Sequence, residues 1–458
     1  MKILFIYILP PKNLCYTEYN SGIASLSAVL KQEDYQTDLL FLYEFNKNYI
    51  NAHIEKSRPD IIGYSFGSHQ FSLAQEIIAY LADYCQVPAI VGGVHATIAP
   101  EECLNIKGVL GVCVGEAEEA FVCFVNAYAE GSDFFDTQNF YFKKNEKIIS
   151  NSLLPLNKNL DLLPFPDRKI FNYDPNEVML GLEFLFSRGC PYTCSFCINP
   201  HLQKLYKDKG PFIRFRTPGS AVREIEETLK LYNYQGAITF HDDVFTQKKS
   251  WLKEFSALYK EKVGLPYVCN STADKIDDEV VLYLKDSGCR EVWVGIETGD
   301  EKLRNQLLNK KVLDKDILNA GKTLKNSGIP LVSYNLIGIP GESEDNIKKL
   351  VDINIKAGVE KTSVSFLQPY PGTKLYEECL KNESINNHEA PTGIKIGIKN
   401  LKVSDTKLYK HFYLFNYYIF GGKHFWILNY LFNFRFFQYL RHKSKNLPPF
   451  IKKILKTI

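Results

Sequence analysis

Two successive series of short apolar segments, separated by amphipathic helical stretches, constrain the fold of this chain more than any other feature. In the first series, within residues 1–132, the strand-like segments are KILFIYIL, TDLLFL, IIGYSF, AIVGG and GVLGVCV. Helical patterns such as SGIASLSAVLKQ and FSLAQEIIAYLADYC lie between them. Consecutive β–α units predict a Rossmann-like parallel sheet covered by helices on both faces. Such a sheet binds ligands at the carboxyl ends of its strands.

The second series occupies residues 179–384. Its strand-like segments are LGLEFLFS, GAITFHD, PYVCNS, EVWVGIE, PLVSYNLIG and TSVSFLQP. Six β–α units predict a partial (β/α)6-type TIM barrel with its active site at the C-terminal ends of the strands. Residues 133–178 look largely irregular and contain the proline-bearing segment LDLLPFPDRKIF, so we interpret them as a linker. Residues 385–458 change to an aromatic, helical pattern and form a C-terminal region.

A cysteine motif, C-x-x-x-C-x-x-C, follows the first strand of the second series in FLFSRGCPYTCSFCINP. Its members are Cys190, Cys194 and Cys197. Three thiolates in one loop can ligate three irons of a [4Fe–4S] cluster. Because no fourth cysteine lies nearby in the sequence, one iron is left open for another ligand, as in catalytic metal sites. A zinc site is the alternative, with His201 as the nearest fourth ligand.

With the aromatic Phe196 just before the last cysteine, this motif resembles the signature of the radical S-adenosylmethionine (SAM) superfamily. The resemblance implies that the open iron binds the amino and carboxylate groups of SAM. One electron from the cluster then cleaves SAM to a 5′-deoxyadenosyl radical, which abstracts hydrogen from the substrate. An external electron donor of the flavodoxin or ferredoxin type is implied as well.

The same resemblance implies SAM-binding residues at the ends of later strands, where a parallel barrel places its ligands. FHDDVFT offers two carboxylates for the methionyl amine, GIETGD offers one for the ribose, and NLIGIPGE resembles the glycine-containing strand beside the adenine. The implied residues, with the cysteine-loop phenylalanine at the adenine, are Phe196, Asp242, Asp243, Glu297, Asn335 and Gly338. Each has an alternative: an aspartate could cap a helix, and the glutamate could pair with a nearby lysine.

The N-terminal domain resembles the cobalamin-binding domain that precedes the barrel in one large radical SAM subclass. GGVHATIAPEECL, VGEAEEAF, LDLLPFP and QPYPGTKLYEECL carry this resemblance, which covers about residues 1–380. A small hydroxyl after one strand could fit beside the nucleotide tail, and paired glycines after the next let the backbone approach a large flat ligand. The implied cobalamin-binding residues are Ser65, Gly92, Gly93, Gly115 and Glu116.

Histidine ligation of cobalamin is not expected. Cobalamin domains that use histidine carry D-x-H-x-x-G after the first strand, whereas the segment here is ILPPKNLCYTEYNSG. His69 and His95 follow other strands, and we interpret them as loop or supporting groups.

The charge of the chain is unevenly distributed. Residues 406–458 contain ten Lys and Arg and no Asp or Glu, so the first 405 residues sum to −7 although the whole chain has +3. Residues 409–440 hold fifteen Phe, Tyr and Trp. Three interpretations compete: helices packed over the barrel mouth, contact with an anionic membrane interface, and nucleic-acid binding, which is the weakest.

The expected location is the cytoplasm, with peripheral contact at the inner membrane face as an option through this tail. Eleven cysteines, mostly scattered singly in apolar segments, suit a reducing compartment. The apolar start stops at Pro10 without a cleavage site, so a buried strand is expected there rather than a signal peptide. No segment has the roughly 18 uncharged apolar residues that span a bilayer.

The sequence therefore predicts a cobalamin-dependent radical SAM enzyme, with methylation of an unactivated carbon as the leading reaction. One SAM would supply the methyl group through cobalamin, and a second would supply the radical. The expected substrate is a small or lipid-like molecule. The alternatives are a non-methylating enzyme of cyclisation or rearrangement and, in another class, a corrinoid- or cluster-binding sensor or carrier without SAM chemistry.

Overall fold

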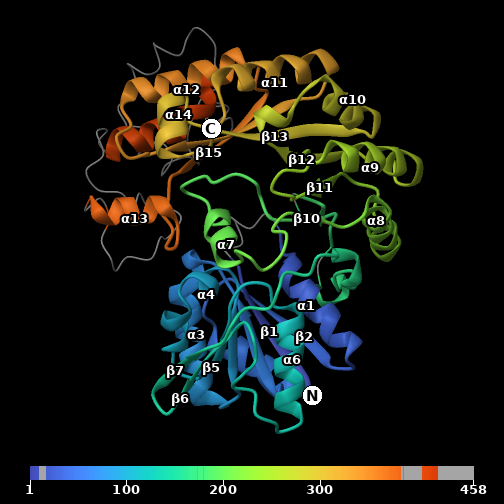
Figure 1. Ribbon diagram of the computed structural model, residues 1–458, viewed down its shortest axis with the longest axis vertical. Coiled ribbons are helices and arrows are strands. Elements are labelled where there is room, and N and C mark those ends of the chain that lie inside the picture. The colour runs from blue at the N-terminus through green and yellow to red at the C-terminus, as the bar shows by residue number, and fades with distance from the viewer. Residues whose placement is uncertain (10–16, 173, 179, 383–384, 386–404, 421–458) are drawn as a thin grey trace, which may run out of the picture.

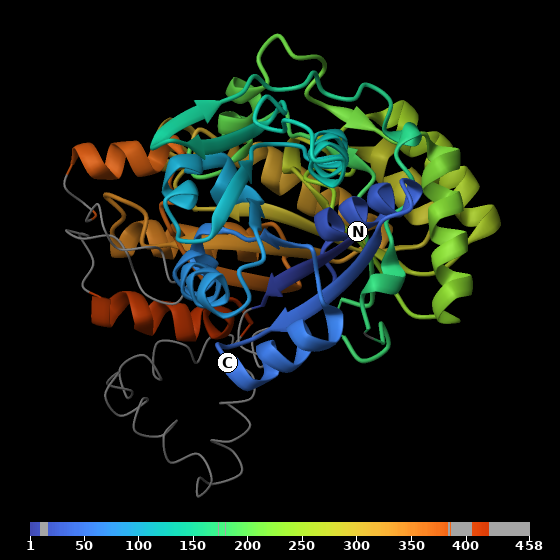
Figure 2. The same ribbon diagram turned by 90° about the horizontal axis from the view of Figure 1, so that it is seen from below.

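The computed structural model describes residues 1–9, 17–172, 174–178, 180–382, 385 and 405–420. Two α/β units are stacked, with the N-terminal unit below the larger unit in Figure 1. The view from below in Figure 2 shows the N-terminal unit in front of the larger one. Helix α7 (Asn199–Leu205) lies between the two units.

The N-terminal unit is a seven-stranded sheet in the order β2-β1-β3-β4-β5-β6-β7. Its first five strands are parallel, as the sequence pattern predicts. Ile3, Leu4, Phe5 and Ile6 are all buried, because helices cover both faces of the sheet. The strands are β1 (Lys2–Ile8), β2 (Gln36–Leu42), β3 (Ile61–Ser65), β4 (Ala89–Gly92) and β5 (Val109–Cys113). The helices are α1 (Ser21–Gln32), α2 (Lys47–Ser57), α3 (Phe71–Tyr84), α4 (Val94–Ile98), α5 (Pro100–Leu104) and α6 (Glu118–Ala129).

Part of the segment expected to be irregular is a β-hairpin. Strands β6 (Phe140–Lys144) and β7 (Lys147–Ser150) are antiparallel to each other, and β6 extends the sheet beside β5. Phe140 and Phe142 are fully buried, which is the alternation of a strand with one buried face. The two turn residues between the strands both have positive φ, as in a type I′ turn, but neither is the glycine that usually signals one.

The larger unit is built on six parallel strands in the order β15-β14-β13-β12-β11-β8, which confirms the predicted partial barrel. The strands are β8 (Leu182–Phe184), β11 (Ile238–Phe240), β12 (Tyr267–Ser271), β13 (Cys289–Glu297), β14 (Leu331–Ile337) and β15 (Lys361–Phe366). The helices are α8 (Pro218–Tyr232), α9 (Lys249–Lys262), α10 (Asp278–Asp286), α11 (Asp314–Ser327), α12 (Glu344–Lys356) and α13 (Lys374–Lys381). A short ribbon of β9 (Ser187–Arg188) and β10 (Arg214–Phe215) and a π-helical turn, Leu303–Leu307, complete it.

The main core of the larger unit lies between its sheet and the surrounding helices. Phe240 on β11 packs edge-on against Phe255 of α9 at 5.5 Å between ring centroids, so this face of the strand points outward to the helices. Strand residues alternate between the two faces. Residues next to Phe240 in sequence therefore point into the barrel.

The described part of the C-terminal region is helix α14 (Asp405–Phe420), which packs beside α12 against β15 (Figure 1). Leu408 and Phe415 are buried in the main core, and Phe412 stacks on Phe366 at 4.5 Å. This helix covers the flank of the sheet rather than its mouth. The other residues behind the predictions for this region, 386–404 and 421–458, lie outside the described residues. None of the described helices is long and apolar enough to cross a bilayer.

Gly321 tests the packing of α11 against α12. A Cβ atom there would lie 2.0 Å from the carbonyl oxygen of Ala357, at the end of α12. We expect Gly321→Ala to reduce the free energy of unfolding by about 1–3 kcal/mol, because the backbone must shift to relieve the overlap.

Gly219 in α8 is the matched control, because a Cβ there meets open space. Gly219→Ala is expected to leave stability unchanged or to raise it by up to about 1 kcal/mol. Thermal melting followed by circular dichroism checks both variants, and equal melting temperatures would contradict the close approach at Gly321.

Candidate functional site

The cysteine loop runs from the end of β9 to the start of α7 and is held in place from outside. The backbone N–H of Ser195 donates to the carbonyl of Leu308 at 2.9 Å, and its hydroxyl donates to that of Leu307 at 2.6 Å. The side chain of Asn309 donates to the carbonyl of Thr193 at 2.8 Å. Residues 307–309, which begin at the end of the π-helical turn, therefore fix the middle of the loop.

Helix α7 fixes the two ends of the same loop. Gln203 donates to the carbonyl of Cys190 at 2.6 Å. The backbone N–H of Asn199 lies 3.5 Å from the sulfur of Cys197, and its side-chain amide lies 3.6 Å from it. Hydrogen bonds to a sulfur stabilise the thiolate over the thiol, which favours metal binding.

The three thiols lie close enough together to act on one another. Burial is the largest cause that raises the pKa of Cys190 to about 12 and that of Cys194 to about 11, and negative charge on neighbouring cysteines acts in the same direction. The ammonium group of Lys310 acts in the opposite direction on Cys194 and Cys197. Because iron binds thiolates, a cluster here would be held by three deprotonated cysteines beside one cation.

Lys310 is paired with Glu297 inside the barrel. Its Nζ lies 2.9 Å from Oε1 of Glu297, and both side chains are only 9% exposed. Burial alone would lower the pKa of Lys310, but the Glu297 carboxylate and the cysteines raise it, so the lysine stays charged. The sequence named Glu297 and allowed for a lysine partner, but it gave no sign that Lys310 was that partner.

Asp242 and Asp243 point to different places. Asp242 is 1% exposed and accepts hydrogen bonds from the backbone N–H groups of Phe186 and Ser187 at 3.1 and 2.6 Å, where the chain leads into the cysteine loop. Asp243 instead accepts from Asn199 at 3.1 Å and lies near Cys190 and Cys197. Burial raises the pKa of Asp242 to about 6 and raises that of Asp243 as well. Of the two predicted SAM-binding aspartates, Asp243 alone faces the cysteines.

Asn335 departs from its predicted position. Its side-chain amide donates to Ser333 at 2.8 Å and to Thr362 at 2.6 Å, and its oxygen accepts from Asn354 of α12 at 3.0 Å. These partners lie on the helix-covered face of β14. The side chain is therefore a buried structural amide, and the prediction that it contacts SAM is wrong for the side chain.

The adenine-side candidates are Phe196 and Gly338. Phe196 packs against a small apolar cluster that includes Ile339, the residue directly after the glycine. Gly338 has φ of +80°, and its N–H donates to the buried carboxylate of Glu342 at 2.7 Å. The ring and the glycine turn thus lie near each other, as a site for a flat base requires.

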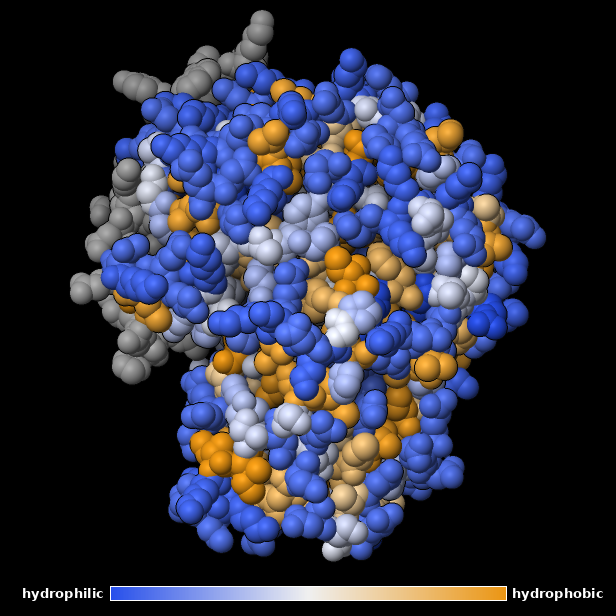
Figure 3. Space-filling view, in the orientation of Figure 1, coloured by the Kyte–Doolittle hydropathy of each residue, from blue (hydrophilic) through white to orange (hydrophobic). Residues whose placement is uncertain are grey.

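A cavity of about 540 Å³ lies between the two units and is lined by both. In Figure 3 apolar side chains gather where the upper and lower units meet. From the N-terminal sheet come Ser65, Gly93 and Gly115, which follow three neighbouring parallel strands. From the larger unit come Asn199 and Asp243 beside the cysteine loop. The strand ends of both units therefore open onto the same space.

One of the predicted cobalamin-binding glycines, Gly93, is required by the backbone itself. A Cβ on Gly93, where φ is +92°, would lie 2.8 Å from the backbone nitrogen of Phe66. Gly92 has no such restriction, since its nearest neighbours would be at 3.8 Å. Gly93 thus makes the tight turn after β4, and any approach of a ligand there is a consequence of that turn.

The side chain of Glu116 also departs from its predicted role. Its two oxygens accept from Arg188, at 2.8 Å, and from Arg214. The carboxylate is therefore occupied by the larger unit. Glu116 nevertheless lines the cavity between the units.

Two histidines occupy very different environments. His95 is 4% exposed, its Nδ1 lies 2.9 Å from the hydroxyl of Ser68, and its ring packs on Phe71 at 4.3 Å. His241, which the sequence analysis did not single out, lines the cavity, and its Nε2 lies 2.6 Å from the carboxylate of Glu183. It directly precedes the two aspartates and shares the cavity with Asp243.

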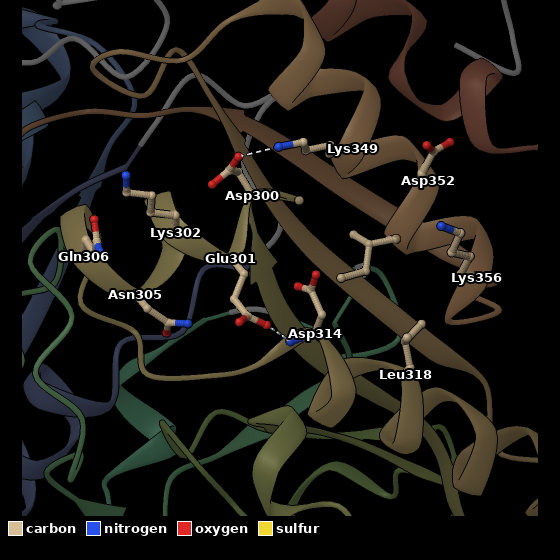
Figure 4. A pocket seen from close by; sticks show the side chains of 12 residues that line it. Asp300, Glu301, Lys302, Asn305, Gln306, Asp314, Leu318, Lys349, Asp352 and Lys356 are labelled. Carbon is tan, nitrogen blue, oxygen red and sulfur yellow. Dashed lines mark hydrogen bonds and ion pairs between the residues drawn. The ribbon is translucent and has the colours of Figure 1, made fainter.

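A second cavity, of about 770 Å³, lies on the outer flank between the π-helical turn, α11 and α12 (Figure 4). Its charged side chains are engaged locally: Asp300 pairs with Lys349 at 2.8 Å, and Glu301 accepts from the backbone of Asp314 at 2.6 Å. None of the predicted site residues lines it. The cavity between the units is therefore the candidate site.

The donor set of the cysteine loop is that of an iron–sulfur cluster. Among the described residues, no group of three or more His, Cys, Asp or Glu side chains is arranged to hold one metal ion. A [4Fe–4S] cluster takes each thiolate on a different iron, so its ligands lie further apart than those of one ion. Three thiols in one loop with a lysine beside them match the donor set of such a cluster.

Comparison with known proteins supports the class of protein that the sequence predicts. Residues 184–353 match the radical SAM superfamily, and residues 13–125 match the B12 binding domain. PH0819 of Pyrococcus horikoshii, an uncharacterized methyltransferase, is 26% identical over 401 residues, covering 83% of this chain and 84% of the relative. The anaerobic magnesium-protoporphyrin IX monomethyl ester cyclase of Rubrivivax gelatinosus is 22% identical over 407 residues, covering 82% and 70%.

Among solved structures, the radical SAM methyltransferase TsrM from Kitasatospora setae, with tryptophan substrate and a SAM analogue bound, has a TM-score of 0.69. It is 17% identical, and the alignment covers 86% of this chain and 80% of TsrM, so the likeness concerns the fold. The fold and the cysteine site define a two-unit α/β enzyme. The chain belongs to the radical SAM superfamily, in the group with an N-terminal cobalamin-binding domain.

The predicted class, fold and cofactors are thereby confirmed. The cofactors are a [4Fe–4S] cluster, SAM and cobalamin. An enzyme of this kind acts on a small molecule and takes electrons from an external donor.

The two neighbouring aspartates provide a test of their different positions. Asp242→Ala should destabilise the chain by about 3 kcal/mol, because buried backbone donors lose their acceptor. Asp243→Asn should leave the melting temperature unchanged but weaken SAM binding about tenfold, the value of one hydrogen bond to a charged group. Melting curves and titration calorimetry of SAM on the cluster-loaded protein check both. Equal changes of the melting temperature in the two variants would contradict the different positions of the two side chains.

Proposed function

We propose that this enzyme methylates an unactivated carbon of a small-molecule substrate. The supporting observation is the shared cavity, to which the strand ends of the B12-binding unit and the cysteine loop both contribute. A single space of this kind would let SAM serve both cofactors in turn. The similarity to PH0819 and the fold of TsrM, both methyltransferases, supports the same reaction.

When bound, the cluster supplies the electron that cleaves SAM and cobalamin carries the methyl group. The remaining tasks belong to the chain. We propose that the cluster ligands are Cys190, Cys194 and Cys197. Lys310, kept charged by Glu297, offers a cation for the carboxylate of SAM, and Asp243 offers an anion for its amine. These charges would orient SAM before it reacts.

The other contacts are proposed from position. Phe196 and the Gly338 turn would border the adenine, and Glu297 would accept a hydrogen bond from the ribose with the oxygen that Lys310 leaves available. Ser65, Gly92, Gly93 and Gly115 would line the floor below cobalamin, with Glu116 contributing its backbone. The external electron donor is proposed to be a flavodoxin or a ferredoxin.

The second candidate function is a radical cyclisation or rearrangement without methyl transfer. The similarity to the Rubrivivax gelatinosus cyclase over most of this chain favours it. Both reactions begin with reductive cleavage of SAM, so they differ in whether SAM also donates its methyl group. The products formed from SAM therefore separate them.

The deciding experiment uses protein reconstituted anaerobically with iron, sulfide and cobalamin, then given SAM and a strong reductant. We expect both 5′-deoxyadenosine and S-adenosylhomocysteine by liquid chromatography and mass spectrometry. 5′-Deoxyadenosine alone would favour the cyclase-type reaction, and neither product would favour a sensor or carrier. Cys197→Ala should lose its iron and 5′-deoxyadenosine, whereas Cys123→Ala, an exposed thiol in α6, should keep both.

We also propose that the C-terminal region contacts a membrane surface, which would suit a lipid-like substrate. Its ten basic and no acidic residues between positions 406 and 458, interleaved with aromatic residues, support this. We expect the full chain to co-sediment with anionic liposomes and a chain ending at Phe420 to remain in solution. That end point keeps α14, whose Leu408 and Phe415 belong to the core. Equal co-sedimentation of both chains would contradict the proposal.

A further inference from the structure

Two arginines face each other at the base of the cysteine loop. In the ribbon of β9 and β10, Arg188 is paired directly with Arg214. Cys190 follows Arg188 by two residues, so the loop grows out of this ribbon. Like charges directly opposite each other destabilise a strand pair. The ribbon therefore depends on acidic groups supplied from elsewhere.

Those acidic groups come from the B12-binding unit. Glu116 lies in the turn after β5 and Glu118 begins α6. Arg188 contacts Glu116 at 2.8 Å and Glu118 at 2.5 Å, and Arg214 binds both oxygens of Glu116. Ser25 of α1 donates to Glu118 at 2.8 Å, which completes the acceptor side. Two arginines of one unit thus meet two glutamates of the other.

A third contact fastens the far end of the cysteine segment to the same turn. Tyr206, which follows α7, accepts a hydrogen bond from the backbone N–H of Glu116 at 2.6 Å through its phenolic oxygen. A Cβ on Gly115 would lie 2.0 Å from that oxygen, so only glycine permits the contact. Arg188 before the cysteines and Tyr206 after them are therefore both bound to residues 115–118.

These contacts are partly buried and remain charged. The side chains of Arg214 and Glu118 are 2% and 12% exposed, and those of Arg188 and Glu116 are 26% and 27% exposed. Burial alone would raise the pKa of Glu118, but the guanidinium of Arg188 lowers it to about 2, so the carboxylate is ionised at neutral pH. Buried ion pairs add little net stability over apolar contacts of the same size. They instead favour one relative position of the two units, because a displaced interface leaves buried charges unpaired.

We propose that Arg188, Arg214 and Tyr206, bound to Glu116 and Glu118, form a clamp that sets the position of the cobalamin-binding unit relative to the cysteine loop. All five residues also line the cavity between the units. They are positioning residues: the clamp holds the two cofactor sites at the separation that SAM must bridge. This inference rests on the proposed function, since only a methyl-transferring enzyme needs SAM to reach both.

The test compares the two products that arise from SAM. 5′-Deoxyadenosine needs the larger unit alone, whereas S-adenosylhomocysteine needs the methyl group of SAM to reach cobalamin. In Glu118→Gln and Tyr206→Phe we expect initial S-adenosylhomocysteine formation to fall about a hundredfold, as a displacement near 1 Å can cause. 5′-Deoxyadenosine formation and cobalamin content should stay near those of the unaltered chain, while the melting temperature falls because each variant removes one partner of a buried polar contact. Arg223→Lys, an exposed arginine of α8, is the control for handling and should change neither product.

A parallel fall of both products, or no change in either, would overturn the clamp. A magnetic measurement separates this failure from failure of the proposed function. Pulsed EPR on protein with Co(II) cobalamin and the reduced cluster should give one narrow distance in the unaltered chain and a shifted or broadened one in the clamp variants. If the unaltered chain makes no S-adenosylhomocysteine but this difference is seen, methyl transfer fails and the clamp stands. An unchanged distance distribution in the variants refutes the clamp whatever the products.

Discussion

The position of the three thiols depends on hydrogen bonds from outside the loop that carries them. A loop without a strand or helix of its own must find partners for its backbone groups elsewhere. Here they come from residues 307–309, from Gln203 on α7 and from the carboxylate of Asp242. Each partner lies in a different part of the larger unit. The thiols can therefore take their places only when the sheet and its connections are already assembled.

The order of the strands and helices could be predicted from the sequence because apolar segments that form buried strands recur along the chain. All eleven strand-like segments of the two series form strands, since each is apolar enough to be buried in a parallel sheet. The β6–β7 hairpin was missed because its turn has no glycine. The class of the site was readable too, since the cysteine spacing is local and needs no knowledge of the fold.

The roles of neighbouring residues were harder to separate, although strand alternation contains the signal. Phe240 faces the helices; past the end of β11, Asp242 turns to the backbone before the cysteine loop, and His241 and Asp243 line the cavity. The same alternation places Asn335 with Ser333 on the outer side of β14. By contrast, nothing local marks Lys310 as the partner of Glu297. Its neighbour Lys311 is also a lysine, so the sequence alone does not tell which of the two pairs with Glu297. The conformation of the turn in the folded protein decides this.

The contact between the two units shows how chemistry limits the kind of interface that can join them. An apolar interface tolerates small slips, because its energy is roughly proportional to buried area and has no direction. A bidentate arginine–carboxylate contact has a fixed geometry. Arg214 makes such a contact with Glu116 and Arg188 makes one with Glu118, and the hydroxyl of Tyr206 accepts from the backbone N–H of Glu116. When one small molecule must react with two cofactors that are bound to separate units, the relative position of the units matters. Directional contacts of this kind fix that position, and apolar burial alone does not.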